Sequence, residues 1–330
     1  MAIKLEELKV GMADKVAEKV VDIFIRESEV LEMLPFDDTV SPSGGSTLTY
    51  SYMQKKLPSS AAFRALNTEY EANQASLEKK SADLKIFGGS FEIDRVINSA
   101  EGKYNNMQYQ IEEKIRAAVG TFHNAMLNGD SSSNASSFDG LDKFLVGQST
   151  EFGANTIIDL SNAETIKKNA DAFYEALLTL INKTRADALF VNEGVKTKIQ
   201  TVARILGYKT ESEEAFGRVV TTIGENKVRI IDLGNVYGVN SGNITETPIV
   251  ATKTRDIGGN KTGLTDIYAA HFSIEDGFHG ATITGDRAIK TYLPDFTKPG
   301  AVKKGEVEMV AAVALKNVKS AGVLRNVKII

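Results

Sequence analysis

Residues 47–93 read TLTYSYMQKKLPSSAAFRALNTEYEANQASLEKKSADLKIFGGSFEI. The pattern of two strands joined by a long polar connection is the most informative feature of the sequence. The stretch opens with a strand pattern that places three large side chains on one face and small polar residues on the other. Those large side chains are Leu48, Tyr50 and Tyr52. A second strand is predicted over residues 82–93, where Leu84 and Ile86 share one face.

The polar stretch between the two strands, residues 57–81, contains few strongly apolar side chains. Hairpin loops usually hold about two to five residues, so a connection of this length is unusual inside a compact domain. The stretch is therefore either disordered or works against another molecule.

A long helix is predicted next, over residues 103–128. At 1.5 Å per residue it would extend about 39 Å, longer than most globular helices. Asn128-Gly129 supplies the stop signal. Apolar residues at three- and four-residue steps form its buried stripe. They are Met107, Ile111, Ile115, Ala118 or Val119, Phe122, and Ala125 or Met126.

An N-terminal helix is predicted over residues 10–34, because apolar residues recur at helical spacing until Pro35 ends the pattern. Two interpretations have about equal weight at this point. The helix either docks on its own domain or is an arm docked on a neighbouring molecule.

From about residue 153 helices and strands alternate. Ser161-x-x-Glu164 reads as a capping box that opens a helix. The apolar face of this helix is Ile166, Ala170, Phe173, Leu177 and Leu180. A short buried strand, 188–191, precedes a second helix that Asn192 caps and Gly207 ends.

The remaining elements are strands. A hairpin is predicted over residues 218–232, followed by strands at 266–272 and 280–284. Alternation from Val307 to Leu315 and the run 323–330 predict the last two strands. The sequence has no internal repeat, and the fold class is α+β.

The composition argues against several classes of function. Lys plus Arg is 39 and Asp plus Glu is 43, a net charge of −4, which does not suit coating nucleic acid by bulk charge. The chain has no Cys, which excludes disulfides, thiolate metal sites and a Cys nucleophile and fits a reducing cytoplasm. A signal peptide and an apolar run long enough to cross a bilayer are both missing.

Catalytic chemistry finds little support. The three histidines, His123, His271 and His279, form no metal-ligand motif and are interpreted as structural. The run 258–263 resembles a phosphate loop superficially, but Arg255 and Asn260 stand where glycines are required. Ser241 lacks the flanking glycines of a nucleophile elbow.

Charged clusters have ordinary explanations too. The acidic pairs Asp37-Asp38, Glu112-Glu113 and Glu213-Glu214 are adjacent residues that diverge in space, so a solvated face explains them best. Residues 298–328 hold seven basic and two acidic residues, 7 − 2 = +5, without interleaved aromatics to stack bases. We read this stretch as strand edges and an interface. We therefore predict no catalytic, cofactor-binding or metal residue, no cofactor, and no enzymatic activity.

Three stretches resemble the major capsid proteins of tailed bacteriophages, which have the Hong Kong 97-type fold. Residues 61–97 look like the return of that family's extended loop into its peripheral domain. Residues 103–130 look like its spine helix, and SFDGLDKFL at 137–145 is similar to the segment that follows it. The match covers essentially the whole chain in architecture, with motifs of moderate specificity.

The resemblance implies an N-terminal arm (1–40), an extended two-stranded loop (41–90), a peripheral domain with the spine helix (91–155 plus about 290–318) and an axial domain (156–289 plus about 319–330). It implies a subunit that self-assembles as pentamers and hexamers into an icosahedral shell around double-stranded DNA, in a virion assembled in the host cytoplasm. Packaged DNA would be contacted nonspecifically at most, and no membrane is involved.

The short stretch before the extended loop suggests that no prodomain is removed, so a separate scaffolding protein and a portal are expected. Some family members crosslink a loop lysine to an asparagine. Lys55, Lys56, Lys79 and Lys80 lie in the loop region, but none can be matched, and we expect no particular crosslink.

Two alternatives stay open. The first is an encapsulin-like bacterial shell that encloses a cargo enzyme. The second, much weaker, is a ligand-binding α+β protein with a site around residues 256–286.

Overall fold

The computed structural model describes residues 28–40, 47–96, 106–208, 211–215, 218–224, 227–240, 243–283 and 289–330. Most of the helix predicted over residues 10–34 lies outside these ranges. Its last turn is described as α2 (Glu29–Met33), where the Ser28 hydroxyl accepts a hydrogen bond from the Leu31 amide at 3.0 Å. The predicted stop at Pro35 is confirmed, because α2 ends just before it.

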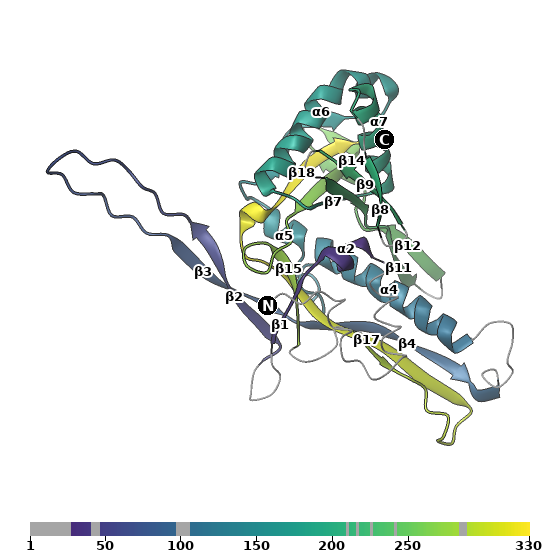
Figure 1. Cartoon of the computed structure of the whole chain (residues 1–330). Coiled ribbons are helices and arrows are strands. Elements are labelled where there is room, and N and C mark those ends of the chain that lie inside the picture. The colour runs from purple at the N-terminus through teal and green to yellow at the C-terminus, as the bar shows by residue number, and fades with distance from the viewer. Residues whose placement is uncertain are drawn as a thin grey trace.

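The described residues form two large sheets with helices packed on them, a separate two-stranded ribbon and a projecting hairpin (Figure 1). The first sheet has the order β1-β15-β17-β16, with β4 also paired to β17. Its strands are β1 (Phe36–Val40), β4 (Lys85–Asp94), β15 (Phe278–Ile283), β16 (Ile289–Tyr292) and β17 (Val302–Leu315). In β17 the predicted inward residues from Val307 to Leu315 are buried, but the alternation ends at Val310, because every residue from Ala311 to Leu315 is buried.

The second sheet has nine strands, in the order β5-β18-β14-β7-β10-β9-β8, with β13 on β14 and β6 on β18. They are β5 (Glu151–Phe152), β6 (Ile158–Asp159), β7 (Ala188–Val191), β8 (Glu211–Ala215), β9 (Arg218–Ile223), β10 (Val228–Asp232), β13 (Lys253–Asp256), β14 (Asn260–Ala270) and β18 (Ala321–Lys328). A separate ribbon joins β11 (Asn235–Asn240) and β12 (Asn243–Pro248), and the predicted hairpin at 218–232 is confirmed as β9 and β10.

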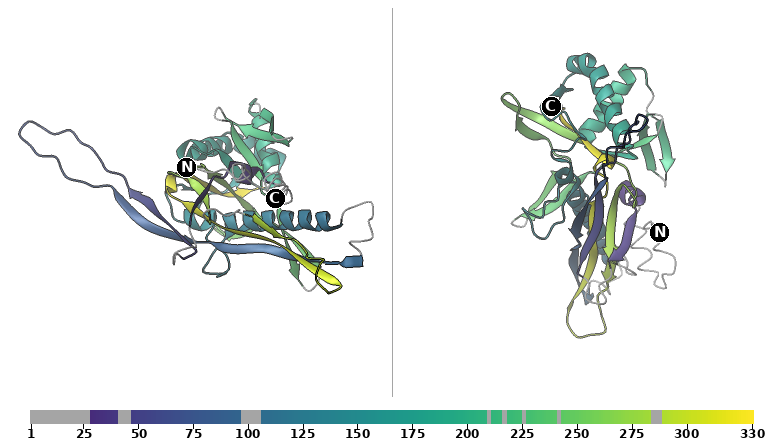
Figure 2. Two further views of the ribbon diagram at one scale, coloured as in Figure 1. Left: turned by 60° about the horizontal axis from the view of Figure 1, so that its bottom comes forward. Right: turned by 90° about the vertical axis from the view of Figure 1, so that its left-hand side faces the viewer.

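Helix α4 (Asn106–Asn128) runs beside β4 and β17 (Figure 2). Its predicted stripe is confirmed, because Ile111, Ile115 and Phe122 are buried. The Phe122 ring lies near those of Phe36, Phe87 and Phe138, at centroid distances of 6.2, 6.0 and 6.1 Å. Residues 103–105 of the predicted helix lie outside the described residues. The short helix α5 (Leu141–Leu145) follows α4.

Helices α6 (Ala163–Thr184) and α7 (Glu193–Ile205) cover one face of the second sheet. Neighbouring residues of β7 point to opposite faces, so Leu189 packs against these helices, whereas Phe190 joins the core shared with α4 and the first sheet. The sheet therefore has no solvated face at β7. All five residues of the predicted apolar stripe of α6 are buried, and Asn192 caps α7 as predicted.

The predicted capping box at Ser161 and Glu164 is wrong by one residue. Asn162 is the cap, and its side-chain oxygen accepts hydrogen bonds from the amides of Glu164 and Thr165 at 3.0 and 2.9 Å. The Thr165 hydroxyl accepts one in return from the Asn162 amide. Ser161 is unavailable for this role because its hydroxyl donates to Asp159 at 2.6 Å.

The strand predicted over residues 82–93 is interrupted. Strand β3 (Ser76–Asp83) ends before Leu84, whose amide donates to the Leu48 carbonyl at 2.8 Å, and β4 begins at Lys85. Side chains of a strand alternate between faces, so a break of one residue reverses which set is buried. Leu84 is consequently buried, but Ile86 is 59% exposed, and the inward set is Phe87, Phe91 and Ile93.

Sheet membership cuts across the predicted division into segments. Strand β15 lies within 156–289 but pairs with β17 of the first sheet, and β5 lies within 91–155 but pairs with β18 of the second. Gly280 makes the edge of the first sheet possible, because a Cβ there would lie 2.5 Å from the Phe36 ring. The division itself stays a prediction.

Candidate interaction surfaces

The hairpin root, meaning the part of β2 and β3 nearest the two sheets, is anchored to the rest of the molecule by hydrogen bonds. Strands β2 (Thr49–Leu57) and β3 pair in antiparallel register from Thr49–Asp83 to Leu57–Ser76. Tyr50 is buried, and its hydroxyl donates to Asp37 at 2.7 Å and lies 3.0 Å from the ring nitrogen of His279. Gln54 adds a hydrogen bond to the Leu315 carbonyl at 2.8 Å.

Asp37 therefore has a structural task that the sequence analysis missed when it read Asp37-Asp38 as a solvated face. Asp37 is partly buried, and its carboxylate accepts the hydrogen bond that the Tyr50 hydroxyl donates. Burial, with the Asp37 hydrogen bond, raises the pKa of Tyr50 well above its usual value. No local sequence pattern predicts this contact, because Tyr50 and Asp37 lie on strands that do not pair with each other.

The distal part of the hairpin, residues 58–75, is exposed along its entire length. The hydrogen bonds of this segment join residues within it. The Ser60 amide donates to the Asn73 side chain at 2.8 Å, and the Thr68 amide donates to the Ala65 carbonyl across the end turn. We call residues 58–75 the tip. It carries three exposed large apolar side chains, Phe63 at 107%, Leu66 at 89% and Tyr70 at 63%.

An exposed apolar patch usually marks an interaction site. The tip contains no helix or strand, is bridged by the Ser60–Asn73 hydrogen bond, and projects away from both sheets (Figures 1 and 2). Of the two interpretations of the polar stretch, the geometry favours contact with another molecule.

Acid should loosen the hairpin root through His279. The ring is fully buried, and burial lowers its pKa to about 4 from an ordinary 6.5. The unfolded chain therefore binds more protons between these values, so the stabilisation is complete above pH 6.5 and is lost as the pH falls to about 4. We expect the advantage of the wild type over His279→Gln to shrink by about 3 kcal/mol on going from pH 7.5 to pH 4.

Urea unfolding of the two proteins across this range measures that difference. The variant Tyr50→Phe keeps His279 and should keep the pH dependence, although it loses a hydrogen bond. An advantage that does not change with pH would mean that His279 is not held neutral by the fold.

The other two histidines have separate partners. His123 lies 2.7 Å from the Ser28 hydroxyl and joins α4 to the cap of α2, and burial lowers its pKa to about 4. His271 lies 2.8 Å from Asp187. His271 and His279, eight residues apart, thus do not share partners. Within the described ranges, the acidic residues and histidines form no group of three placed to hold a metal ion.

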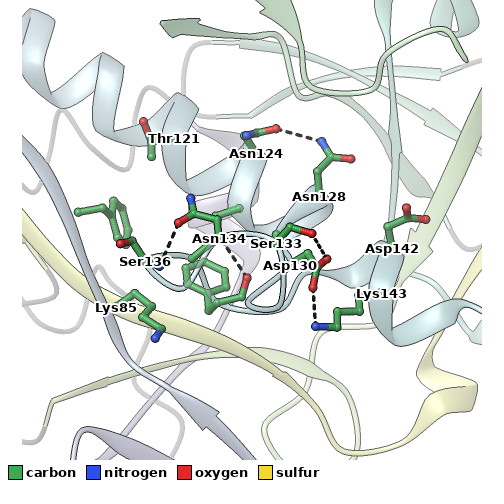
Figure 3. Close-up of a pocket in the computed structure, with 15 residues that line it drawn as sticks. Lys85, Thr121, Asn124, Asn128, Asp130, Ser133, Asn134, Ser136, Asp142 and Lys143 are labelled. Carbon is green, nitrogen blue, oxygen red and sulfur yellow. Dashed lines mark hydrogen bonds and ion pairs between the residues drawn. The ribbon is translucent and has the colours of Figure 1, made fainter.

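A groove of about 650 Å³ opens at the C-terminal end of α4 (Figure 3). Its polar groups engage one another: Lys143 contacts Asp130 at 2.6 Å, and Asn128 donates to Asn124 at 3.0 Å. The hydrogen bond from Lys143, with others from Ser132 and Ser133, holds the pKa of Asp130 far below its usual range. A carboxylate paired in this way is a poor acid or base at neutral pH. The polar groups of this groove therefore have a structural role, which is to stabilise the loop that follows α4.

A buried ionic cluster lies between α5 and strands of the second sheet. Arg325 on β18 contacts Asp142 on α5, Glu151 on β5 at 2.8 Å and Asp266 on β14 at 3.2 Å. Its side chain is 7% exposed, and that of Asp266 is 2% exposed. Burial would raise the pKa of Asp266, but Arg255 outweighs it with two hydrogen bonds at 2.5 and 2.6 Å, so this pKa stays below its usual value.

The cluster was not predicted from the sequence. Its members come from five elements, and Arg325 was counted only as part of a basic C-terminal surface. It is instead a buried structural residue. Paired in this way, the charges fix how α5 sits on the second sheet.

The remaining sequence candidates do not converge. Residues 258–259 belong to the turn between β13 and β14, where the Gly259 amide donates to Asp256, so the phosphate-loop likeness is a hairpin turn. Ser241 and residues 284–288 lie outside the described residues. In the part of the chain that is described, no helix is long and apolar enough to cross a membrane.

Comparisons with solved structures identify the fold, whereas comparisons of the sequence find no match. No family model and no curated protein matches this sequence. Among solved structures, the chain is similar to an encapsulin, the holo-SrpI encapsulin complex from Synechococcus elongatus PCC 7942, with a TM-score of 0.54, 12% identity, and 97% of each chain covered.

Two further structures agree. One is from Mycobacterium phage Bobi, with a TM-score of 0.53 and 10% identity over 90% of this chain and 89% of that one. The other is the capsid of a native GTA particle, with a TM-score of 0.50 and 11% identity over 87% and 88%. The chain has the α+β Hong Kong 97-type fold, as the resemblance implied. These matches establish the fold of this chain.

Proposed function

We propose that the protein is a major capsid protein, which self-assembles into the icosahedral head shell around the double-stranded DNA genome of a tailed bacteriophage. The observation that carries the proposal is the tip: a projecting, exposed segment with three large apolar side chains, on a Hong Kong 97-type fold. Two of the similar structures, one from a phage and one described as a capsid, support it.

The geometry suits this role. A closed shell needs heterologous contacts, in which one surface meets a different surface of the next copy. A hairpin with an anchored root and an exposed tip can bury apolar area on a neighbour and leave the body of its own subunit unchanged. The subunit would work through these contacts as a structural protein and not as an enzyme.

The finer assignments follow the same proposal. Pentamers and hexamers would form with a separate scaffolding protein and a portal, in the host cytoplasm, and the mature subunit would reside in the virion. DNA would be contacted nonspecifically at most. The first sheet with α4 would form the peripheral domain, and the second sheet with α6 and α7 the axial domain. Residues 1–40 and 41–90 would be the arm and the extended loop.

A second candidate is an encapsulin-like shell enclosing a cargo protein. The specific observation in its favour is the similarity to an encapsulin over 97% of both chains. The two candidates share the fold and the shell, and they differ in what the shell contains.

Expression of the full chain, alone and with a co-expressed scaffolding protein, tests both candidates by light scattering and negative-stain electron microscopy. We expect uniform shells, or rings that close only with the scaffold. Nuclease-protected DNA in particles produced during phage infection supports the capsid, whereas a co-purifying cargo protein identified by mass spectrometry supports the encapsulin-like shell. A monomer or dimer that never forms rings would sink both and return attention to residues 256–286.

A further inference from the structure

A basic groove lies at the root of the hairpin, on the side facing the turn after β17. It has a volume of about 330 Å³ and is lined by four lysines and one glutamate, 4 − 1 = +3. Lys55, Lys56 and Lys80 come from the hairpin, and Lys319 comes from the short 3-10 helix η2 (Val318–Ser320). The backbone holds the two sides together, because the Lys55 amide donates to the Lys316 carbonyl at 3.2 Å.

The single acidic side chain of the groove is already engaged. Glu78 contacts Lys80 at 2.9 Å and Lys56 at 3.7 Å. Lys55 and Lys319 have no carboxylate partner among the residues that the structure describes. The groove thus presents two unpaired ammonium groups, fixed to different elements, around a space sized for one or two side chains.

The tip has the opposite character. It contains one basic and two acidic residues, 1 − 2 = −1. Arg64 is turned back on the tip itself: its guanidinium lies 5.4 Å from the Tyr70 ring and donates to the Thr68 carbonyl at 3.2 Å. Glu69 and Glu71 are exposed, and neither has a cation partner within the described ranges.

Glu69 and Glu71 of the tip cannot reach the groove of their own chain, although Pro58 at the start of the tip lines the groove. Lys55 pairs with Leu77 in the hairpin register. Glu71 stands six residues before Leu77, which in extended chain at 3.3 Å per residue is about 20 Å away. A contact between the two surfaces therefore requires two molecules.

We propose that the tip of one copy docks at the basic groove of a second copy, with Glu69 and Glu71 facing Lys55 and Lys319. The inference rests on the proposed function, because it needs a shell in which hairpins of neighbouring copies meet. Glu78 inside the groove and the lack of aromatic lining residues disfavour a nucleic-acid strand as the occupant. Charge complementarity of this kind selects partner and register.

Charge reversal tests the pairing. The double variants K55E/K319E and E69K/E71K should each raise the concentration needed for shell formation about tenfold at low salt, because each replaces attraction by repulsion. The quadruple variant restores opposite charges and should assemble near the wild-type concentration. As a control for net charge, K167E/K168E changes two exposed lysines of α6 by the same amount.

Crosslinking supplies a second measurement that does not depend on variants folding. Treatment of wild-type shells with a carbodiimide should join Lys55 or Lys319 to Glu69 or Glu71, and the same treatment of dissociated subunits should not. Peptide mass spectrometry identifies the joined residues.

The outcomes separate cleanly. Shells that form normally from both double variants, or a quadruple variant no better than the doubles, would overturn the inference and leave the proposed function standing. Loss of packaged DNA with K55E/K319E, without any effect of E69K/E71K, would assign the groove to nucleic acid instead. If the wild type never forms shells, the proposed function falls, and this pairing falls with it.

Discussion

Replacing Arg325 by alanine should lower the free energy of unfolding by about 3–5 kcal/mol, the largest single-residue effect that we expect on stability. The side chain contacts three carboxylates, and Asp266 beside it is 2% exposed. Removal of the guanidinium leaves carboxylates buried with too few partners, and burying a charge without compensation is costly. Urea unfolding followed by circular dichroism measures the loss.

Lys328→Ala is the matched control, because Lys328 lies on the same strand but is 32% exposed, with a 3.6 Å contact to the similarly exposed Asp159. It should change stability by no more than about 0.5 kcal/mol. Equal losses for the two variants would show that the cluster is no more important to the fold than a surface ion pair.

Replacing the tip by a two-residue Asn-Gly turn should abolish shell formation without unfolding the subunit. Leu57 and Ser76 are the last pair of the hairpin register, so a two-residue turn fits between them. The stability of the subunit should stay within about 0.5 kcal/mol of the wild type, because the deleted segment is exposed throughout. Thermal unfolding and electron microscopy of the same preparation report the two properties.

A variant of full length separates the apolar side chains from the length of the tip. Phe63→Ser, Leu66→Ser and Tyr70→Ser together keep the hairpin but remove its exposed apolar area, and we expect this variant to assemble far less well than the wild type. Normal shells from the deletion variant would refute a role for the tip in assembly.

Local pattern was a good guide to elements and a weaker guide to their edges. The stripe of α4 and that of α6 are buried as predicted, because each depends only on 3.6-residue periodicity within one helix. The capping box was placed one residue early, since Ser161 and Asn162 are both good caps and the competing Asp159 hydrogen bond decides between them. The break at Leu84 was missed, because Ile86 fits either face until the partner of β4 is known.

The sequence by itself determined the α+β class, the helices with their buried faces, and the presence of a long polar excursion that no compact domain needs. These properties depend on composition and on contacts between residues near each other in the chain. The tertiary structure alone decided which charges are buried and which are free. Arg325 and Lys319 are six residues apart in one basic stretch, yet the first is enclosed by carboxylates and the second faces an open groove. Burial is set by distant elements meeting at one place, and a linear pattern carries no record of that meeting.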